Sequence, residues 1–406
     1  MDRRTARRLM VAAVLGGLVL RLAFGLLYWT GKPLTHDEQE YLSLARSLSA
    51  GQGFVYDDAV EIGTGQQFGR APGYPLFLAM IGAGQPGVAE APRGIKIAQA
   101  LIGAAGVWLI GLIALQASGP RAGAVAAGIA AIYPPLLTLP AYVLSETLYS
   151  TVALGGVLLL QNAAAGRSRA PRLRMAGVGA VWGTAVLIRP ATIVFLPLAM
   201  LWLGVRRKYA LALTLGCAAG LVIAPWTVRN MRVYDRFVLV ASEGGVTFWT
   251  GNHPLAIGEG DLAANPAIKL AELEFRRSHA GLTPEALEPR YYADAMAYIR
   301  SHPGWWLGLV ARKAYYLVVP TGPSYALHSS RYRVASAVPY LLLLPFALAG
   351  ARRISRVEHP PAALFLLACS AVLTCLIFFP QERFRIPVLD PMLIVCAAGL
   401  AGAHRS

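Results

Sequence analysis

The chain has 406 residues, of which 56% are hydrophobic and only 14% are charged. With a mean hydropathy of +0.51, this composition excludes an ordinary soluble enzyme and indicates an all-α membrane protein with many spans. The formal net charge of +16 does not indicate a nucleic-acid partner, because Lys and Arg fall mostly in short clusters between apolar runs, as membrane topology signals do. The four cysteines all lie inside apolar runs without a CxxC pair, and we interpret them as small core residues: Cys217, Cys369, Cys375 and Cys396.

The first apolar run, from about residue 9 to 30, follows the basic start "MDRRTARRLM". It is longer than the apolar region of a signal peptide and lacks a small-residue cleavage site, so we predict a retained first span with a cytoplasmic N-terminus. Further runs of spanning length follow at residues 95–117, 121–140, 143–164, 174–189, 191–205, 209–227, 336–351, 361–379 and 386–403. The sequence therefore predicts about ten membrane spans.

Two apolar segments, residues 72–84 and 305–320, are predicted to lie on the membrane surface instead. The first is short for a span, and the second is interrupted by Arg312 and Lys313 among Trp and Tyr residues. If 72–84 does not cross, the basic groups at 121, 167–174, 206–208 and 352–356 all fall on the cytoplasmic side, as the positive-inside rule expects.

This topology places a first loop (31–94) and a polar segment from about 229 to 304 on the outer, periplasmic face. The polar segment is small and interrupted by Pro and Gly, so an independent domain is not expected there. We therefore divide the chain into an N-terminal membrane module (1–228), a small outer segment (229–304), and a C-terminal part with one surface helix and further spans (305–406).

The stretch "LTHDEQEYLSLARSLSAGQGF", residues 34–54, opens the first outer loop with two adjacent acids. Thr35 and Glu38 match a capping box, which favours a scaffolding role for Glu38. The predicted helix has an apolar face that includes Tyr41 and ends at Gly51. Asp37 lies on this apolar face, so it is either a functional acid or an acid that favours the helix dipole.

Other polar residues are expected at membrane depth on the same face. Glu146 begins a span, where a carboxylate either caps the helix or faces a wet cavity or a partner. Arg189 ends a span and is either a snorkelling anchor or a functional cation. Further cations on this face run against the positive-inside trend, as a site for an anionic headgroup would require: Arg93, Lys96, Arg229, Arg383 and Arg385.

An ordered set of motifs then carries a family resemblance. After the first span come "HDEQEYLSLARSLSAGQGF", "GRAPGYPLFLAM", "LSETLY", "LIRP", "WTVRN", "GNHP" and "ERFRIPVLDPMLIVCAAGL". In this order the chain resembles the GT-C glycosyltransferases, within the mannosyltransferase and aminoarabinose-transferase-like branch that uses polyprenyl-phosphate sugars. The resemblance covers nearly the whole chain, and its specificity rests on the order of the motifs rather than on any one of them.

The resemblance implies a fold in which the first outer loop forms two helices along the membrane, above a core of spans. It implies that Asp37 is the catalytic base, with Glu38 as the adjacent acid and Glu146 as a second-site acid. The cations it implies for the donor phosphate are Arg189 and Arg385, and we add Arg383, Arg93 and Arg229 as candidates. Candidates for contact with the sugar or the acceptor are Tyr74, Asn252 and His253.

The expected reaction needs these groups. A base must deprotonate the acceptor, and cations must hold the phosphate that leaves from the donor. A single base predicts inversion at the anomeric carbon, whereas a retaining reaction would need a second carboxylate, for which Glu146 is the candidate. No cofactor is firmly indicated, and a divalent cation on His36, Asp37 and Glu146 stays open.

We therefore expect a hexosyl- or pentosyltransferase that moves a sugar from a polyprenyl-phosphate donor to a lipid, glycan or protein acceptor at the outer face. Its partners are these substrates and the membrane lipids, with no nucleic acid. The alternative is a transporter or flippase of lipid-linked sugars, which predicts repeated halves, and no matching halves are evident. A catalytically inactive member would be expected to lack the first-loop acid, and Asp37 is present.

Overall fold

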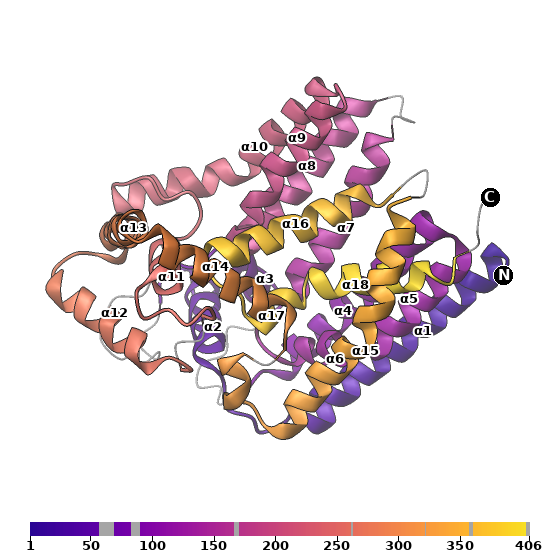
Figure 1. The fold of residues 1–406 in the computed structure, drawn as a ribbon, viewed down its shortest axis with the longest axis horizontal. Helices are drawn as coiled ribbons and strands as arrows, with labels where there is room; N and C mark the ends of the chain where they lie inside the picture. Colours follow the sequence, from indigo (N-terminus) through magenta and orange to yellow (C-terminus); the bar gives the residue numbers. More distant parts are fainter. Residues whose placement is uncertain are drawn as a thin grey trace.

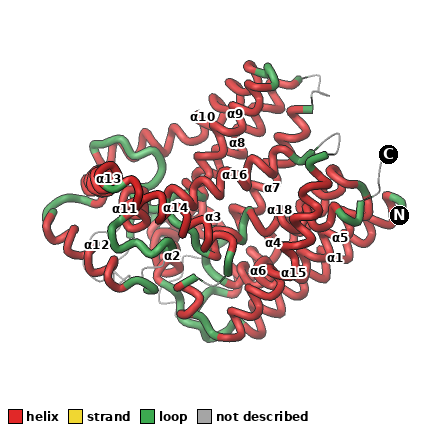
Figure 2. The backbone as a smooth tube through the Cα atoms, in the orientation of Figure 1, coloured by secondary structure: helices red, strands yellow, loops and turns green. Residues whose placement is uncertain are grey.

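The computed structural model describes residues 1–56, 69–82, 90–165, 170–260, 263–320, 322–356 and 360–402. Within these ranges the secondary structure is helical, with no strand (Figure 2). The N-terminus lies at one end of the molecule, and the helices of the predicted outer loop and of the polar segment lie at the other (Figure 1). This confirms the predicted all-α class.

Helices cover the predicted apolar runs, although their bounds differ. They are α1 (Arg3–Ala23) with a π-helical continuation (Phe24–Tyr28), α4 (Arg93–Ser118), α5 (Pro120–Ile132), α7 (Glu146–Ala164), α8 (Pro171–Ile188), α9 (Phe195–Val205) after a 3-10 turn (Pro190–Val194), α10 (Tyr209–Tyr234), α15 (Ser330–Ile354), α16 (Ala362–Ile377) and α18 (Leu389–Gly399). Four helices of the described chain are long and apolar enough to cross a membrane: Arg3–Tyr28, Arg93–Ser118, Tyr209–Tyr234 and Ser330–Ile354. The number of ten spans therefore stays a prediction.

Close helix contacts depend on small residues. A Cβ atom at Gly179 of α8 would lie 2.5 Å from the carbonyl oxygen of Leu215 on α10. A Cβ atom at Gly350 of α15 would lie 1.8 Å from the carbonyl oxygen of Cys396 on α18. Only glycine permits these two approaches, which is how helices commonly pack where lipid provides no hydrophobic driving force.

The predicted span at 121–140 is a bent pair of helices, which together are long and apolar enough to count as a fifth candidate span of the described chain. It breaks after Ile132, and a short helix α6 (Pro134–Thr138) and a 3-10 turn (Leu139–Ala141) follow at a bend of 62°. Pro134 and Pro135 have no N–H, so they cannot donate to the carbonyls of Ala130 and Ala131 four residues earlier.

Arg21 of α1 takes the place of the missing donors. Its guanidinium donates to the carbonyls of Ala130 (3.2 Å) and Ala131 (3.3 Å). The side chain is only 3% exposed, and sequence analysis did not assign it a role. A cation inside the first span therefore satisfies the carbonyls that the Pro-Pro break leaves without partners.

The predicted span at 386–403 is also shorter in the structure. Its helix, α18, has 11 residues, or roughly 16 Å at 1.5 Å per residue. It begins two residues after Pro387 and is preceded by the short helix α17 (Glu382–Arg385). Nearly all of α18 is buried, so it is a core helix of the bundle.

The outer elements are short helices. The first outer loop forms α2 (His36–Ser49) and α3 (Gly73–Met80). Gly51, the predicted end of the first of these helices, has a left-handed φ of +72°. The polar segment forms α11 (Gly244–Asn252), α12 (Pro266–Ser278) and α13 (Pro284–Ser301), and the chain continues as α14 (Pro303–Val318) and a 3-10 turn (Pro323–Leu327). The eight residues of α3 are too few to cross a bilayer, as predicted for 72–84, of which 83 and 84 lie outside the described residues.

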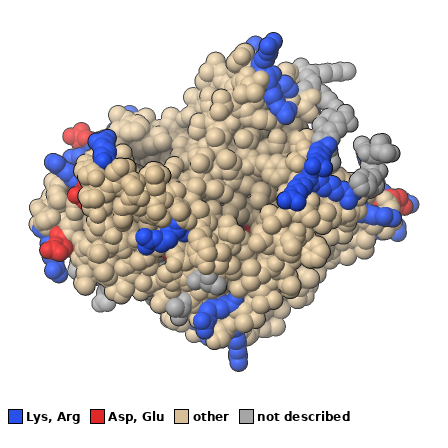
Figure 3. All heavy atoms as spheres, viewed as in Figure 1, with Lys and Arg blue, Asp and Glu red and all other residues tan. Residues whose placement is uncertain are grey.

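Basic side chains gather near the ends of α9 and α15, at the end of the molecule that also holds the N-terminus (Figures 1 and 3). This arrangement agrees with the predicted basic groups at 206–208 and 352–356. Residues 167 and 169 of the cluster at 167–174 lie outside the described part. Helix α10 continues past residue 228 to Tyr234, so the boundary we drew between the first two segments falls inside a helix.

Candidate functional site

The start of α2 has the predicted capping box. The Glu38 carboxylate accepts from the backbone N–H (2.8 Å) and the hydroxyl (2.9 Å) of Thr35. Its other oxygen accepts from the backbone N–H of Val143 (2.8 Å). With 3% of its surface exposed, Glu38 fixes α2 to the turn that precedes α7 and has no free oxygen for a substrate.

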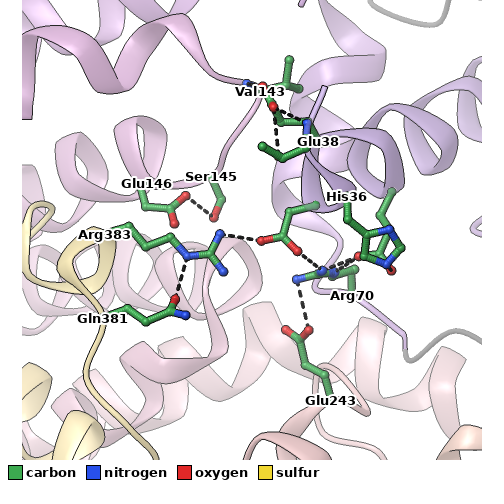
Figure 4. A network of polar contacts seen from close by, with 12 residues as sticks. His36, Glu38, Arg70, Val143, Ser145, Glu146, Glu243, Gln381 and Arg383 are labelled. Carbon is green, nitrogen blue, oxygen red and sulfur yellow. Dashed lines mark hydrogen bonds and ion pairs between the residues drawn. The ribbon is translucent and has the colours of Figure 1, made fainter. Parts of the chain in front are cut away.

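Asp37 lies one residue earlier and binds two arginines. One carboxylate oxygen accepts from Arg70 (2.7 Å) and the other accepts from Arg383 (2.5 Å). Figure 4 shows these two guanidinium groups approaching from opposite sides. Burial alone would raise the pKa of Asp37, but Arg70 and Arg383 hold it well below its usual range. Asp37 is therefore an ionised acceptor, and not only a first-turn acid.

Arg70 contacts two further carboxylates. Its guanidinium pairs with Glu40 of α2 and with Glu243 (3.2 Å) at the start of α11, and it lies 5.3 Å from the ring centre of Tyr41. Burial would lower the pKa of Arg70, but Glu243, Asp37 and Glu40 raise it. Sequence analysis missed this residue, although "GRAPGY" was among the quoted motifs, because its partners Glu40 and Asp37 lie 30 and 33 positions away in the sequence.

The residue before Arg70 is bonded to the polar segment. The backbone N–H of Ser242 donates to the carbonyl of Gly69 (3.0 Å), and the backbone N–H of Gly69 donates to the Ser242 hydroxyl (2.7 Å). That hydroxyl also donates to Glu285 of α13 (3.3 Å). The two outer segments predicted from the sequence are thus joined directly beside Asp37.

The predicted pair Glu146 and Arg189 lies next to this cluster. They form an ion pair of 3.1 Å, in which Glu146 is buried at the start of α7 and Arg189 follows α8. The Arg189 guanidinium lies 4.8 Å from the ring centre of Phe384, the neighbour of Arg383. Burial would lower the pKa of Arg383, but Asp37 and Glu146 raise it, so Glu146 acts on the same cation as Asp37.

Three predicted phosphate-binding arginines are placed differently. Arg385 forms an ion pair with Asp390 (3.0 Å), where both side chains are almost fully buried, and it holds α17 against α18. Arg229 donates to the Phe54 carbonyl (3.3 Å) and packs among aromatic rings. Arg93 is exposed at the first turn of α4. None of the three is bonded to Asp37 in the described structure.

The predicted contacts for sugar or acceptor hold structural elements together. Tyr74 is fully buried and its hydroxyl donates to Gln99 (3.0 Å). Asn252 is also fully buried and accepts from the amine of Lys313 (2.9 Å). His253 lies against the Trp249 ring, with ring centres 4.2 Å apart, and burial lowers its pKa.

The residues suggested for a divalent cation do not form a site for one. Both oxygens of Asp37 are bonded to guanidinium groups, and Glu146 is paired with Arg189. His36 lies 3.6 Å from Glu40 instead. Among the described residues, no three His, Cys, Asp or Glu side chains are grouped so that they could hold a metal ion.

No family model and no curated protein sequence matches the chain. Among solved structures, it is similar to the oligosaccharyltransferase of Archaeoglobus fulgidus. With a tethered acceptor peptide, that structure gives a TM-score of 0.57 at 14% identity, covering 98% of this chain and 49% of that one. With an inhibitory peptide and a dolichol-phosphate, it gives 0.55 at 15% identity, covering 97% and 50%. A further structure of the same enzyme is a complex with zinc and sulfate.

The chain therefore spans about half the length of this archaeal protein. The chain is more weakly similar to ArnT from Cupriavidus metallidurans bound to undecaprenyl phosphate, with a TM-score of 0.41 at 16% identity. This match covers 99% of this chain and 78% of that one. At these identities the comparison concerns the fold alone. The fold is the GT-C fold that the sequence resemblance predicted.

Proposed function

We propose that the chain is an integral membrane glycosyltransferase that moves a sugar from a polyprenyl-phosphate donor to an acceptor on the outer face of the membrane. The observation that carries this proposal is the position of Asp37, an ionised carboxylate bonded to Arg383 on one side and Arg70 on the other. A base beside a cation is the pair that this reaction requires.

In the proposed reaction Asp37 takes the proton of the acceptor group as that group attacks the anomeric carbon. The bond between this carbon and the phosphate oxygen breaks, and the phosphate leaves with the electron pair. Arg383 and Arg189 balance its growing negative charge. One displacement with one base inverts the anomeric carbon. Glu146, which is paired with Arg189, orients this cation and is not the nucleophile.

Arg383 is suited to bind the leaving phosphate. Its side chain is 38% exposed, compared with 18% for Arg189 and 4% for Arg385. When a phosphate oxygen accepts the hydrogen bond that Arg383 otherwise donates to Asp37, one oxygen of Asp37 loses its partner. The Asp37 carboxylate then becomes more basic, because a nearby cation favours its ionised form less strongly. Donor binding would in this way prepare the base.

The fold supports the proposal by analogy only. The archaeal structure that shares it is described as an oligosaccharyltransferase and was solved with a dolichol-phosphate. The identity of the sugar, and of the lipid, glycan or protein acceptor, does not follow from this likeness. The site of the described chain supplies the chemistry, and the fold supplies a precedent for a lipid-phosphate donor.

The test is transfer of labelled sugar by the purified protein in lipid nanodiscs, with a panel of polyprenyl-phosphate sugars and a membrane extract as acceptor. Asp37→Asn keeps the shape of the side chain and removes the base, so we expect transfer to fall by about two to four orders of magnitude. The matched control is Asp294→Asn, whose carboxylate accepts from the Trp249 indole (2.7 Å) outside the cluster.

Equal transfer by wild type and Asp37→Asn would exclude Asp37 as the base. If neither protein transfers sugar while the wild type moves lipid-linked sugar across a bilayer, the transporter alternative replaces the enzyme. A loss that Asp294→Asn shares to the same degree would reflect folding and would also count against the catalytic assignment.

A further inference from the structure

We propose that the guanidinium of Arg70 is the resident cation of this site and occupies the place that a divalent metal would take among Asp37, Glu40 and Glu243. Arg70 is then a positioning residue, and sugar transfer proceeds without a divalent metal. This inference rests on the proposed function for its activity, but not for the cation site itself.

The three carboxylates converge on one group. Arg70 bonds Asp37 at 2.7 Å, Glu243 at 3.2 Å, and Glu40. Figure 4 shows Glu243 below Arg70 and His36 to its right. Asp37 and Glu40 are one helical turn apart on α2, whereas Glu243 belongs to the polar segment. A group that joins three carboxylates from two segments has the role of a structural metal ion.

A guanidinium can fill this role because of its shape. It presents five N–H donors in one plane and keeps its charge at every physiological pH. Asp37 and Glu40 both accept from Nη2 of Arg70, Glu40 also accepts from Nε, and Glu243 pairs with Nη1. The Tyr41 ring lies 5.3 Å from the centre of the guanidinium. Only 16% of the Arg70 side chain is exposed, so the ion pairs are shielded from water and salt.

In the described structure the three carboxylates are spread around the guanidinium and are not grouped closely enough to hold a metal ion. If the guanidinium were removed, their repulsion would be left unbalanced, and we expect them to close around a divalent cation. Oxygen-rich, negatively charged groups are the ligands that Mg²⁺ and Mn²⁺ prefer. The imidazole of His36 stands 3.6 Å from Glu40 and could complete the set. With Arg70 in place, one oxygen of Asp37 is fixed in direction, which leaves the other toward Arg383 and the substrate.

The first test measures Mn²⁺ binding by electron paramagnetic resonance on the full chain in nanodiscs, after the metal has been stripped with a chelator. Wild type is expected to bind no Mn²⁺ at this site, and Arg70→Ala is expected to gain one ion, which Arg70→Ala combined with Glu243→Gln loses again. The matched control is Arg276→Ala, which frees the single carboxylate of Glu272 and should gain none.

A stoichiometric Mn²⁺ ion on wild type would overturn the inference, and so would Arg70→Ala that binds none. Arg70→Lys keeps the charge without the planar fork and is expected to gain no Mn²⁺. This variant and the wild type keep the test decisive if Arg70→Ala does not fold. Because binding of Mn²⁺ needs no sugar, the outcome is independent of the proposed reaction.

The second test applies chelation and metal addition to the transfer assay. Wild type should keep its activity within about twofold in excess chelator. Arg70→Ala should lose about 10- to 100-fold, in line with a mispositioned base, and regain part of it with millimolar Mn²⁺. Wild-type transfer that is abolished by chelation and restored by metal would overturn the inference while leaving the proposed function intact.

Discussion

The pKa of a carboxylate in this protein depends on the groups that surround it. Asp37 has two guanidinium partners and a lowered pKa. No guanidinium is among the main groups that shift the pKa of Glu288 on α13. Burial raises the pKa of Glu288 to about 7, and the negative charges of Glu285 and Glu243 add to this rise. Hydrogen bonds from the backbone N–H groups of Gly245 and Gly244 lower the pKa and offset part of the rise. The fold thus stabilises one acid in its charged form and the other in its neutral form.

The neutral acid gives a pH prediction. Because the folded-state pKa of Glu288 is raised above its usual 4.5, its contribution to stability is present below pH 4.5 and is lost as pH rises through about 7. Glu288→Gln should therefore raise Tm by a few degrees at pH 8, corresponding to about 1–3 kcal/mol, and leave it unchanged near pH 4.5. Exposed Glu274→Gln on α12 is the control, and an equal rise at both pH values would contradict the argument.

At the scale of elements, the break between α5 and α6 depends on a residue of another helix. Pro134 and Pro135 explain why the helix stops, but they leave two carbonyls without donors in an apolar environment. Arg21 of α1 bonds both of them. The bend and the buried arginine are therefore one structural unit made from two separate helices.

Arg21→Leu should lower the thermal stability of the protein in detergent or nanodiscs, because it leaves two buried carbonyls unsatisfied. We expect a loss of about 1–3 kcal/mol, measured as a fall in Tm. Arg21→Lys should be intermediate, since an ammonium cannot span both carbonyls as a guanidinium does. The control is Arg8→Leu on the exposed start of α1. A variant as stable as wild type would show that water or lipid can replace Arg21.

At the scale of the whole molecule, the charge distribution and the site define two ends. The N-terminus and the basic groups after α9 and α15 lie at one end, and α2 and α11 to α13 lie at the other (Figures 1 and 3). From the positive-inside rule we expect the basic end to be cytoplasmic. The proposed function predicts, on the same basis, that the Asp37 cluster lies at the outer face.

Cysteine labelling in intact cells checks this orientation. Ala280→Cys, in the turn between α12 and α13, should react with a membrane-impermeant maleimide added outside. Ser355→Cys, directly after α15, should react only after the membrane is permeabilised; both positions are exposed. The wild-type protein, without an added cysteine, gives the background labelling of the four native cysteines. The reverse pattern would place the site in the cytoplasm and remove the outer-face proposal.

The sequence by itself determined the all-α membrane class, the GT-C resemblance, the capping box at Thr35 and Glu38, and the helix that Gly51 ends. The class, the capping box and the helix end depend on hydrophobic length and on residues three or four positions apart, so they can be identified from the chain alone. The resemblance rests instead on the order of the motifs along the chain. The sequence also singled out Asp37, Glu146, Arg189 and Arg383, which the structure brings together, without showing which of them are bonded.

Only the tertiary structure decided the partners. Arg383 and Asp37 are 346 positions apart in sequence, and Arg70 and Asp37 are 33 apart. The same holds for Arg21 and the carbonyl of Ala131, which are 110 apart. A buried charge is stabilised by whichever opposite charge or acceptor the packing brings to it, and no local pattern records that choice. For this reason Arg70 and Arg21 went unnoticed in the sequence, and Arg385, which resembles Arg383 there, is paired with Asp390 in the core.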